Sequence, residues 1–395
     1  MRLFIPLAVL IIATPAFSQE LDLDFDSFGF DENSEITFDT LPETGMEVSA
    51  TVSLSYSGIG ALNQSSAAQI SLANEHSLGT LGFLEWAANA TIIDYDIEFD
   101  LSRIHLQNST GNFSWKLGKY RIGWGEIEGA PVLDVVNALL SFGDVNLSSD
   151  ELPGQWFIGL DYFASSVTVS SFLGIVPGVS HAIPATDSTD IEVGIKASLP
   201  IESGSVNLYA ARLVPQSGVV DIHSDTSHAT PYVLAGFSTN RSFGDMLFEV
   251  DVASKFGLQR STATALSYHN RIDAALGVEY AASNTMQVTA AVSGQHWLEQ
   301  SEDYFEFDGY LSTQNAANYI VGVSEELMDG KLSVSANILG TLNNNVNVTA
   351  LSASYSYSDR LEFGASAMWL SAETGAQFEA MDGYEQYGLT SKFHF

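Results

Sequence analysis

The strongest constraint in this chain is a period of two between apolar and polar residues. Over residues 47–58, EVSATVSLSYSG, the apolar positions from Val48 to Tyr56 fall on one face of an extended chain, and serines and a threonine fall on the other. This period fits a β-strand and does not fit a helix, whose period is 3.6. The same alternation recurs in DIEVGIKASLP, MLFEVDVASKF and RIDAALGVEY. We therefore expect an all-β chain whose strands each have one oily and one polar face.

The connections between these segments are of two kinds. Short ones near residues 202, 241, 283, 329 and 359 alternate with longer polar ones near 176–190, 212–230, 258–267, 299–316 and 372–384. Outer-membrane barrels have this asymmetry, with short periplasmic turns and longer outer loops. Hydrocarbon does not tolerate an open sheet edge, so such a sheet must close.

The strand count is estimated from the C-terminus. Counting back at about ten residues a strand gives roughly 18 strands. The stretch IIDYDIEFDLSRIHL fits either a tight hairpin or one bent strand, which leaves 16 open. The expected fold is a closed antiparallel transmembrane β-barrel of 16–18 strands, with 18 favoured.

The N-terminus predicts an exported chain. Residues 1–18, MRLFIPLAVLIIATPAFS, have one arginine, an apolar run and small residues before the expected cleavage site, which is the pattern of a signal peptide. The apolar run is well short of the roughly 20 residues that a membrane-spanning helix needs. The chain has no cysteine, so no disulfide can hold the exported fold together. Residues 46–395 are expected to form the barrel.

Residues 19–45 lie between the signal peptide and the first strand and are strongly acidic. Asp22, Asp24 and Asp26 suggest calcium, but Ser27 and Asn33 stand where an EF-hand needs Gly and Glu, so no metal site is predicted. Two interpretations stay open. The segment is a solvated periplasmic arm, or it is a plug whose interleaved Leu and Phe residues fold back into the barrel.

A long insert interrupts the repeat within residues 116–154. About 30 of these residues cannot form a regular strand, and long connections in compact folds usually serve a function. Val132, Val135, Val136 and Leu139 have helix-like spacing, and Pro131 suits a first helical turn. We expect the insert to fold inward, pack on the barrel wall and narrow the lumen.

The insert also contains a short motif. The run Gly118, Arg121, Trp124-Gly125-Glu126, followed by Asp134 and Asn137, resembles the G-(R/K)-x-x-x-x-W-G-E and D-(x)-x-N motif of a family of Gram-negative porin-like barrels, similar in architecture to alginate-export barrels. Ala138 departs from the proline that often follows the asparagine. The resemblance implies a channel. The candidate constriction residues are Arg121, Trp124, Gly125, Glu126, Glu128, Asp134 and Asn137. Arg121 and Glu126 are expected either to pair and fasten the insert or to contact the solute.

The C-terminal segment YGLTSKFHF resembles the closing-strand signal by which outer-membrane barrels are recognised for assembly. It places Tyr387, Leu389, Phe393 and the terminal Phe395 on one face. The expected partners are therefore the barrel-assembly machinery and outer-membrane lipid with lipopolysaccharide, besides a small solute.

Charge suggests the selectivity of such a pore. The formal net charge is −34, which excludes nucleic acid as a partner through repulsion. The expected lumen-wall charges are nearly balanced and include Glu249, Asp251, Arg271, Asp273 and Glu279. Residues 126–151 carry six carboxylates and no Lys or Arg. We therefore predict passive diffusion of small solutes with a preference for cations.

Other functions remain open. One is a plugged transporter of hydrophobic compounds, or polysaccharide export, and another is a structural or adhesive barrel. An outer-membrane hydrolase would need an activated Ser with His and an orienting acid or amide, but the eight histidines form no recognisable nucleophile motif. His223, Asp221 and His228 form one local cluster, interpreted as a polar surface loop. No enzyme activity or cofactor is predicted, and neither the solute nor the oligomeric state can be read from the sequence.

Overall fold

A computed structural model describes most of the expected barrel. The residues it describes are 47–59, 62–93, 96–127, 130, 132–137, 154–175, 191–215, 219–221, 226–262, 266–299, 304–305, 315–342, 345–374 and 379–394. The expected signal peptide, the acidic segment 19–45, Glu128 and Phe395 lie outside these ranges, so those predictions are not addressed by the structure.

The described chain is built almost entirely of strands. The barrel strands are β1 (Glu47–Ile59), β2 (Leu62–Ser77), β3 (Phe83–Ile93), β4 (Asp96–Thr110), β5 (Phe113–Tyr120), β6 (Gln155–Phe163), β7 (Thr168–Ile175), β8 (Ile191–Ile201), β9 (Gly204–Leu213), β12 (Tyr232–Phe243), β13 (Met246–Thr262), β14 (Leu266–Ala281), β15 (Met286–Trp297), β17 (Asn315–Leu327), β18 (Leu332–Thr341), β19 (Val346–Ser358), β20 (Leu361–Ala372) and β21 (Tyr384–His394). Shorter elements are β10 (Val219–Asp221), β11 (Thr226–His228), β16 (Tyr304–Phe305), η2 (Gly79–Leu81) and η4 (Glu379–Met381).

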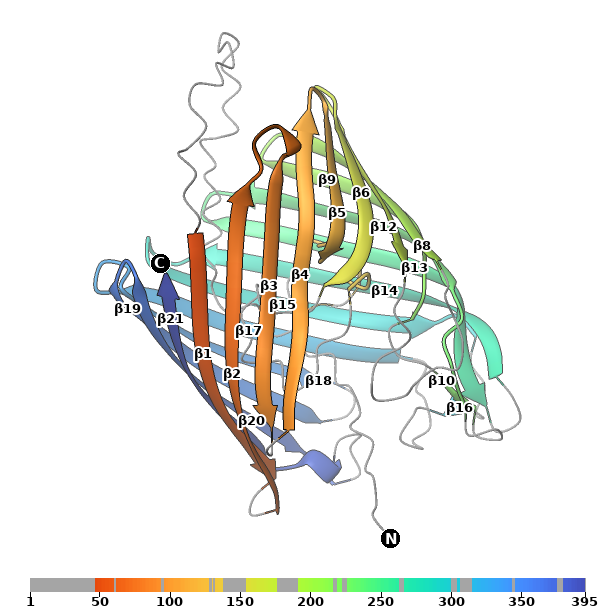
Figure 1. The fold of residues 1–395 in the computed structure, drawn as a ribbon. Coiled ribbons are helices and arrows are strands. Elements are labelled where there is room, and N and C mark those ends of the chain that lie inside the picture. Colours follow the sequence, from red (N-terminus) through yellow and green to blue (C-terminus); the bar gives the residue numbers. More distant parts are fainter. Residues whose placement is uncertain are drawn as a thin grey trace.

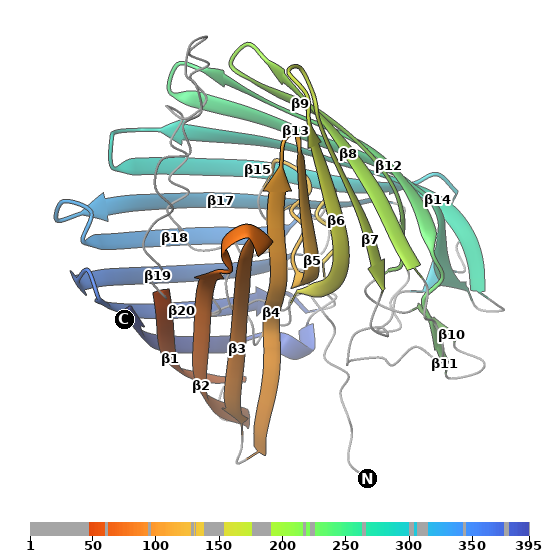
Figure 2. The same cartoon turned by 45° about the horizontal axis from the view of Figure 1, so that its top comes forward.

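The sheet closes on itself. β1 pairs antiparallel with β2 on one side and with the last strand, β21, on the other. Figures 1 and 2 show the resulting barrel, in which 18 strands follow one another in chain order. The segment that left 16 strands open is a hairpin, because Ile93 on β3 faces Asp96 on β4 in the ladder. Within the described residues, no helix is long and apolar enough to cross a membrane.

The two ends of the barrel differ. Short turns close one end, here called the turn end, at residues 78–82, 111–112, 164–167, 202–203, 244–245, 282–285, 328–331 and 359–360. The strands that precede and follow the insert, residues 121–154, and the connections 176–190, 214–231, 298–314 and 373–383 meet the other end of the barrel, here called the loop end. The prediction of a long connection near residues 258–267 was wrong. β13 continues to Thr262 and β14 resumes at Leu266, because polar residues here form an extended hairpin of paired strand.

The two faces of the wall are as the alternation predicts. Val52 and Leu54 are 39% and 54% exposed on the outside, whereas Ser53 between them is 9% exposed. Leu389 is 61% exposed on the outer face of the last strand, where Tyr387 and Phe393 also lie. The outer face is therefore an apolar band, and the polar residues face the lumen.

Glycines on the inner face make room for aromatic rings on the next strand. In the ladders, Phe157 is opposite Gly174 and Phe172 is opposite Gly194. A Cβ built on Gly174 would lie 2.5 Å from the Phe157 ring. Each ring therefore occupies the space that a side chain at the neighbouring glycine would need.

Candidate functional site

The insert begins where β5 ends, and its described residues contact polar side chains of the wall. Its described residues are 121–127, 130 and 132–137, and they contain turns and bends but no helix. The helix expected from the spacing of Val132, Val135 and Val136 is therefore wrong for the described part. Their burial was predicted correctly, because Val132 and Val136 are 3% and 0% exposed. Apolar residues spaced three and four positions apart indicate only which side chains are buried. A chain without regular secondary structure can bury the same side chains.

The Glu126 side chain of the insert contacts the wall. Its Oε1 accepts hydrogen bonds from Asn207 Nδ2 at 2.5 Å and from Ser238 Oγ at 3.1 Å. Its Oε2 accepts one from Asn240 Nδ2 at 2.6 Å. Asn207 and Ser238 face each other in the β9–β12 ladder. The carboxylate is therefore held by neutral amide and hydroxyl groups of two adjacent strands.

Asp251 continues the same row onto β13, where it is opposite Ser238. It is 1% exposed, and its two carboxylate oxygens accept the backbone N–H of Glu126 at 3.1 and 3.2 Å. Oδ2 also accepts the N–H of Ile127 at 3.4 Å. Both the side chain and the backbone of Glu126 are thus bound to one row of the sheet, formed by Asn207, Ser238 and Asp251.

Asn137 holds the insert to itself. Its Oδ1 accepts the backbone N–H of Ile122 at 2.7 Å, and its Nδ2 donates to the carbonyl of Ile122, also at 2.7 Å. The same Nδ2 donates to Asp134 Oδ1 at 3.0 Å. The two ends of the described insert are therefore joined through one buried amide.

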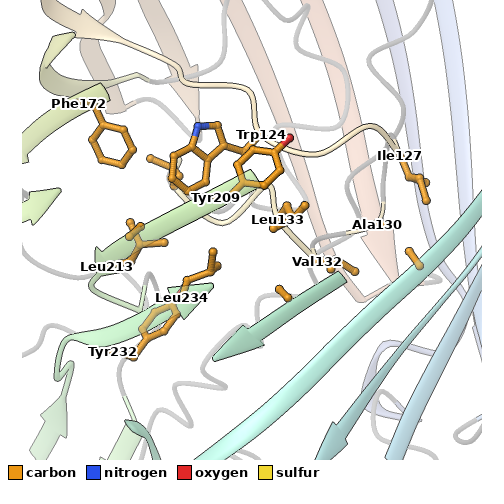
Figure 3. Packing of buried hydrophobic residues seen from close by; sticks show 14 of the residues in the cluster. Trp124, Ile127, Ala130, Val132, Leu133, Phe172, Tyr209, Leu213, Tyr232 and Leu234 are labelled. Atoms are coloured by element: carbon orange, nitrogen blue, oxygen red, sulfur yellow. The ribbon is translucent and has the colours of Figure 1, made fainter. Parts of the chain in front are cut away.

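An aromatic and aliphatic cluster covers this region. The Trp124 ring lies 5.4 Å from Phe172 and 5.1 Å from Tyr209, measured between ring centroids. Figure 3 shows Trp124 beside Tyr209, with Leu133 and Leu234 below them. Trp124 is 5% exposed and Leu133 is 0% exposed. Trp124 and Asn137 are therefore buried in the packing of the insert.

The remaining motif residues differ in accessibility. Arg121 and Glu126 are half-buried, and Asp134 is exposed. Arg121 is attracted electrostatically by Asp134, which belongs to the insert itself. Gly125 has φ +90°, and a Cβ there would lie 2.7 Å from Asp251 Oδ2. The described hydrogen-bond partners of the Glu126 side chain are wall amides and a hydroxyl and not Arg121, so whether Glu126 fastens the insert or contacts a solute stays a prediction.

A second charged group lies nearer the loop end, on β13 and β14. Lys255 Nζ lies 2.6 Å from Asp273 Oδ2, and both side chains are at most 5% exposed. Arg271 binds the same carboxylate through Nε at 2.7 Å and Nη2 at 2.8 Å. The Arg271 guanidinium also lies 5.1 Å from the Trp297 ring. Two cations therefore share one carboxylate.

Two further predicted lumen residues lie closer to the turn end. Glu249 is 7% exposed, two residues before Asp251 on β13. Glu279 is half-buried and accepts a hydrogen bond from Gln287 Nε2 at 2.8 Å. Among the residues that the structure describes, no group of three or more His, Asp or Glu is arranged to hold a metal ion.

Sequence reasoning missed the wall residues that receive the insert, namely Asn207, Tyr209, Ser238 and Asn240. The available signal was weak. In SVNLYAARL, Asn207 is a polar residue with large apolar neighbours, at a position that alternation assigns to the lumen. Alternation gives the face but does not say which other segment will meet it.

Comparisons with known proteins support the fold. No protein-family model matches the sequence, and no curated protein matches it. The structure is similar to Pseudomonas aeruginosa OccD3 (OpdP), with a TM-score of 0.58 and 10% identity over 90% of this chain and 92% of that one. It is similar to P. aeruginosa OccK2 (OpdF) in complex with glucuronate, with a TM-score of 0.55 and 10% identity over 89% and 98% of the two chains.

P. aeruginosa OprD gives a TM-score of 0.55 and 12% identity over 89% of this chain and 95% of that one. These identities are low enough that the likeness concerns the fold alone. The similarity to alginate-export barrels expected from the W-G-E motif stays a prediction. The chain has the closed 18-strand barrel fold of Gram-negative outer-membrane porins, and this barrel fits a location in the outer membrane.

Proposed function

We propose that this protein is a porin-like channel for passive diffusion of small solutes, and that it prefers cations. The main support is that the Glu126 carboxylate accepts its described hydrogen bonds from neutral groups only, namely Asn207, Ser238 and Asn240. Neutral donors stabilise an ionised carboxylate without cancelling its charge. Asp251 places a second carboxylate beside it, bonded to backbone N–H groups. The insert and the wall therefore bring two carboxylates together, and Lys196 offsets part of the charge of Asp251.

This charge acts on a permeating ion only at short range. At physiological salt the screening length is about 8 Å, so groups lining a narrow path dominate over charges on distant loops. Asp134 adds an exposed carboxylate to the insert, although Arg121 offsets part of its charge. Glu126 and Asp134 are therefore the residues on which the proposed preference depends.

The test is the reversal potential of single channels under a potassium chloride gradient. The wild-type potential should indicate cation preference, and Glu126→Gln with Asp134→Asn should move it towards zero, more strongly at low salt. Glu326→Gln removes a carboxylate from an exposed site at the turn end and is the matched control. A potential that the insert variants leave unchanged would contradict the proposal.

An anionic solute is a second candidate, because Lys255 and Arg271 share the single carboxylate of Asp273. OccK2 was crystallised with glucuronate, an anion. A reversal potential of the opposite sign in the wild-type channel, moved towards zero by Arg271→Gln, would favour this candidate.

The plug hypothesis for residues 19–45 needs its own measurement. Deleting residues 20–45 should raise the single-channel conductance sharply if they plug the barrel, and should leave it almost unchanged if they form a free arm. Outer-membrane location and folding are checked by fractionation and by heat-modifiable migration on a gel. Recovery of a soluble periplasmic monomer would exclude a channel of any kind.

A further inference from the structure

A hydrogen-bonded chain of three side chains lies on the inner wall at the loop end of β14. Ser267 Oγ lies 2.8 Å from His269 Nε2, and His269 Nδ1 lies 2.8 Å from Glu299 Oε2. Ser267 and His269 are two residues apart on one strand and therefore point to the same face. Glu299 follows the end of β15, the next strand of the barrel. Figure 1 shows where β14 and β15 run in the wall.

We propose that Ser267, His269 and Glu299 form a serine esterase site at the loop end of the lumen. Nucleophilic serine catalysis needs one ring nitrogen of the histidine on the serine hydroxyl and the other on a carboxylate. His269 meets this requirement, with Nε2 on Ser267 and Nδ1 on Glu299. When Nδ1–H donates to Glu299, Nε2 carries a lone pair and accepts the Ser267 hydroxyl proton. Ser267 is then the nucleophile, His269 the general base and Glu299 a positioning residue that fixes the ring and its tautomer.

Accessibility fits these roles. Ser267 is half-buried, so a small ester in the lumen can reach its hydroxyl. The His269 side chain is 9% exposed and that of Glu299 is 60% exposed. The base is thus shielded from bulk water, while the carboxylate contacts it from the solvent side.

Nearby cations indicate the class of substrate. Arg260 on β13 is directly opposite Ser267 in the ladder, where side chains of paired residues lie within reach of each other. Its guanidinium lies 4.2 Å from the Trp297 ring, and that of Arg271 lies 5.1 Å from the same ring. A cation beside the nucleophile can stabilise the oxyanion of a tetrahedral intermediate. It also favours an ester that carries an anionic group.

The reaction needs only the ester and water. Ser267 Oγ bonds to the carbonyl carbon as its proton moves to His269 Nε2. The bond from that carbon to the leaving oxygen then breaks, and His269 returns the proton to the departing alcohol. Water adds to the acyl-serine in the same way, which releases the carboxylic acid and restores the Ser267 hydroxyl.

The first experiment uses a fluorophosphonate probe on the folded full-length protein in detergent, with the labelled serine identified by peptide mass spectrometry. Ser267 should label at least tenfold faster than Ser335, a lumen serine whose described partner is the Ser352 hydroxyl at 2.8 Å. Labelling should disappear in Ser267→Ala and fall more than tenfold in His269→Ala. Identifying the labelled serine in the wild-type protein tests the proposal even if a variant fails to fold. Equal labelling of Ser267 and Ser335 would overturn the proposal.

The second experiment separates positioning from simple structural support. Glu299→Ala should reduce the labelling rate and hydrolysis of 4-nitrophenyl acetate, and Glu299→Asp should restore part of both, while heat-modifiable migration stays as in the wild type. Arg260→Gln should reduce hydrolysis of the anionic 4-sulfophenyl acetate more than that of 4-nitrophenyl acetate. No hydrolysis above the Ser267→Ala background with either ester would refute the site, and would leave the channel proposal untouched.

Discussion

The Asp251 carboxylate accepts the backbone N–H of Glu126 at 3.1 and 3.2 Å, although 125 residues of chain separate the two. Asp251 projects from the wall and Glu126 belongs to the insert. Two acidic side chains repel each other. These two residues can nevertheless lie together, because the Asp251 carboxylate binds the backbone of Glu126 and not its side chain. The Glu126 side chain is directed instead to Asn207, Ser238 and Asn240. Two acidic residues are thereby held close together at one level of the lumen.

Removing the Asp251 carboxylate should loosen the insert. Asp251→Ala leaves the N–H groups of Glu126 and Ile127 without this acceptor, and an unsatisfied buried donor destabilises by about 1–3 kcal/mol. We expect a lower midpoint of thermal unfolding, followed by heat-modifiable migration, and noisier single-channel currents. Glu326→Ala at the exposed turn end should change neither. Currents as quiet as those of the wild type would show that the insert does not depend on this contact.

Alanine at Gly125 should be poorly tolerated. The residue has φ +90°, and an added Cβ would lie 2.7 Å from Asp251 Oδ2, so both strain and a clash oppose the change. A residue other than glycine held at such a φ destabilises the fold by about 1–3 kcal/mol. Gly123, two residues earlier, has nothing within 4 Å of a built Cβ and serves as the control. Equal unfolding midpoints for Gly125→Ala and Gly123→Ala would be evidence against the described turn.

Alanine at Gly194 should disturb the packing between wall and insert. Its Cβ would lie 2.3 Å from the Phe172 ring and 2.8 Å from Trp124. Overpacking of this kind destabilises by about 1–3 kcal/mol. Gly294→Ala is the matched change on β15, where the nearest atom is a backbone oxygen at 3.4 Å. The measurement is Trp fluorescence during denaturant unfolding, and unchanged stability of Gly194→Ala would contradict the aromatic cluster.

Asp273→Asn should be among the most destabilising changes in the wall. It leaves Lys255, whose side chain is 2% exposed, without the carboxylate at 2.6 Å. Breaking one partner of a buried pair destabilises by about 3–5 kcal/mol because the other charge stays buried. Adding Lys255→Met should recover part of this loss. A double-mutant cycle measures the coupling, and purely additive effects would mean that the pair does not act as a unit.

The barrel could be predicted because its signal is local. An alternating segment such as residues 47–58 can place its apolar side chains on one face only as a strand. Val52 and Leu54 on the outside, and Ser53 on the inside, follow from that period alone. The strand count was less secure, since it depended on one tight hairpin, which the pairing of Ile93 with Asp96 establishes.

The insert shows where local patterns fail. The spacing of Val132, Val135 and Val136 correctly predicted that Val132 and Val136 are buried, but the helix that it also predicted is wrong over the described residues. The Asn137 side chain binds both backbone polar groups of Ile122, at 2.7 Å each. Contacts with the wall and this clip replace the internal hydrogen bonds that a helix would have supplied.

The sequence by itself determined the strands, their two faces, the closed sheet and the place of the insert along the chain, because these depend on residues that are neighbours in the chain. Only the tertiary structure decided what those faces meet. Glu126 finds partners 81, 112 and 114 residues away, and His269 reaches Glu299 across a separation of 30. Such contacts depend on strand register, on closure and on the path of the insert, and all three are properties of the assembled barrel rather than of any one segment.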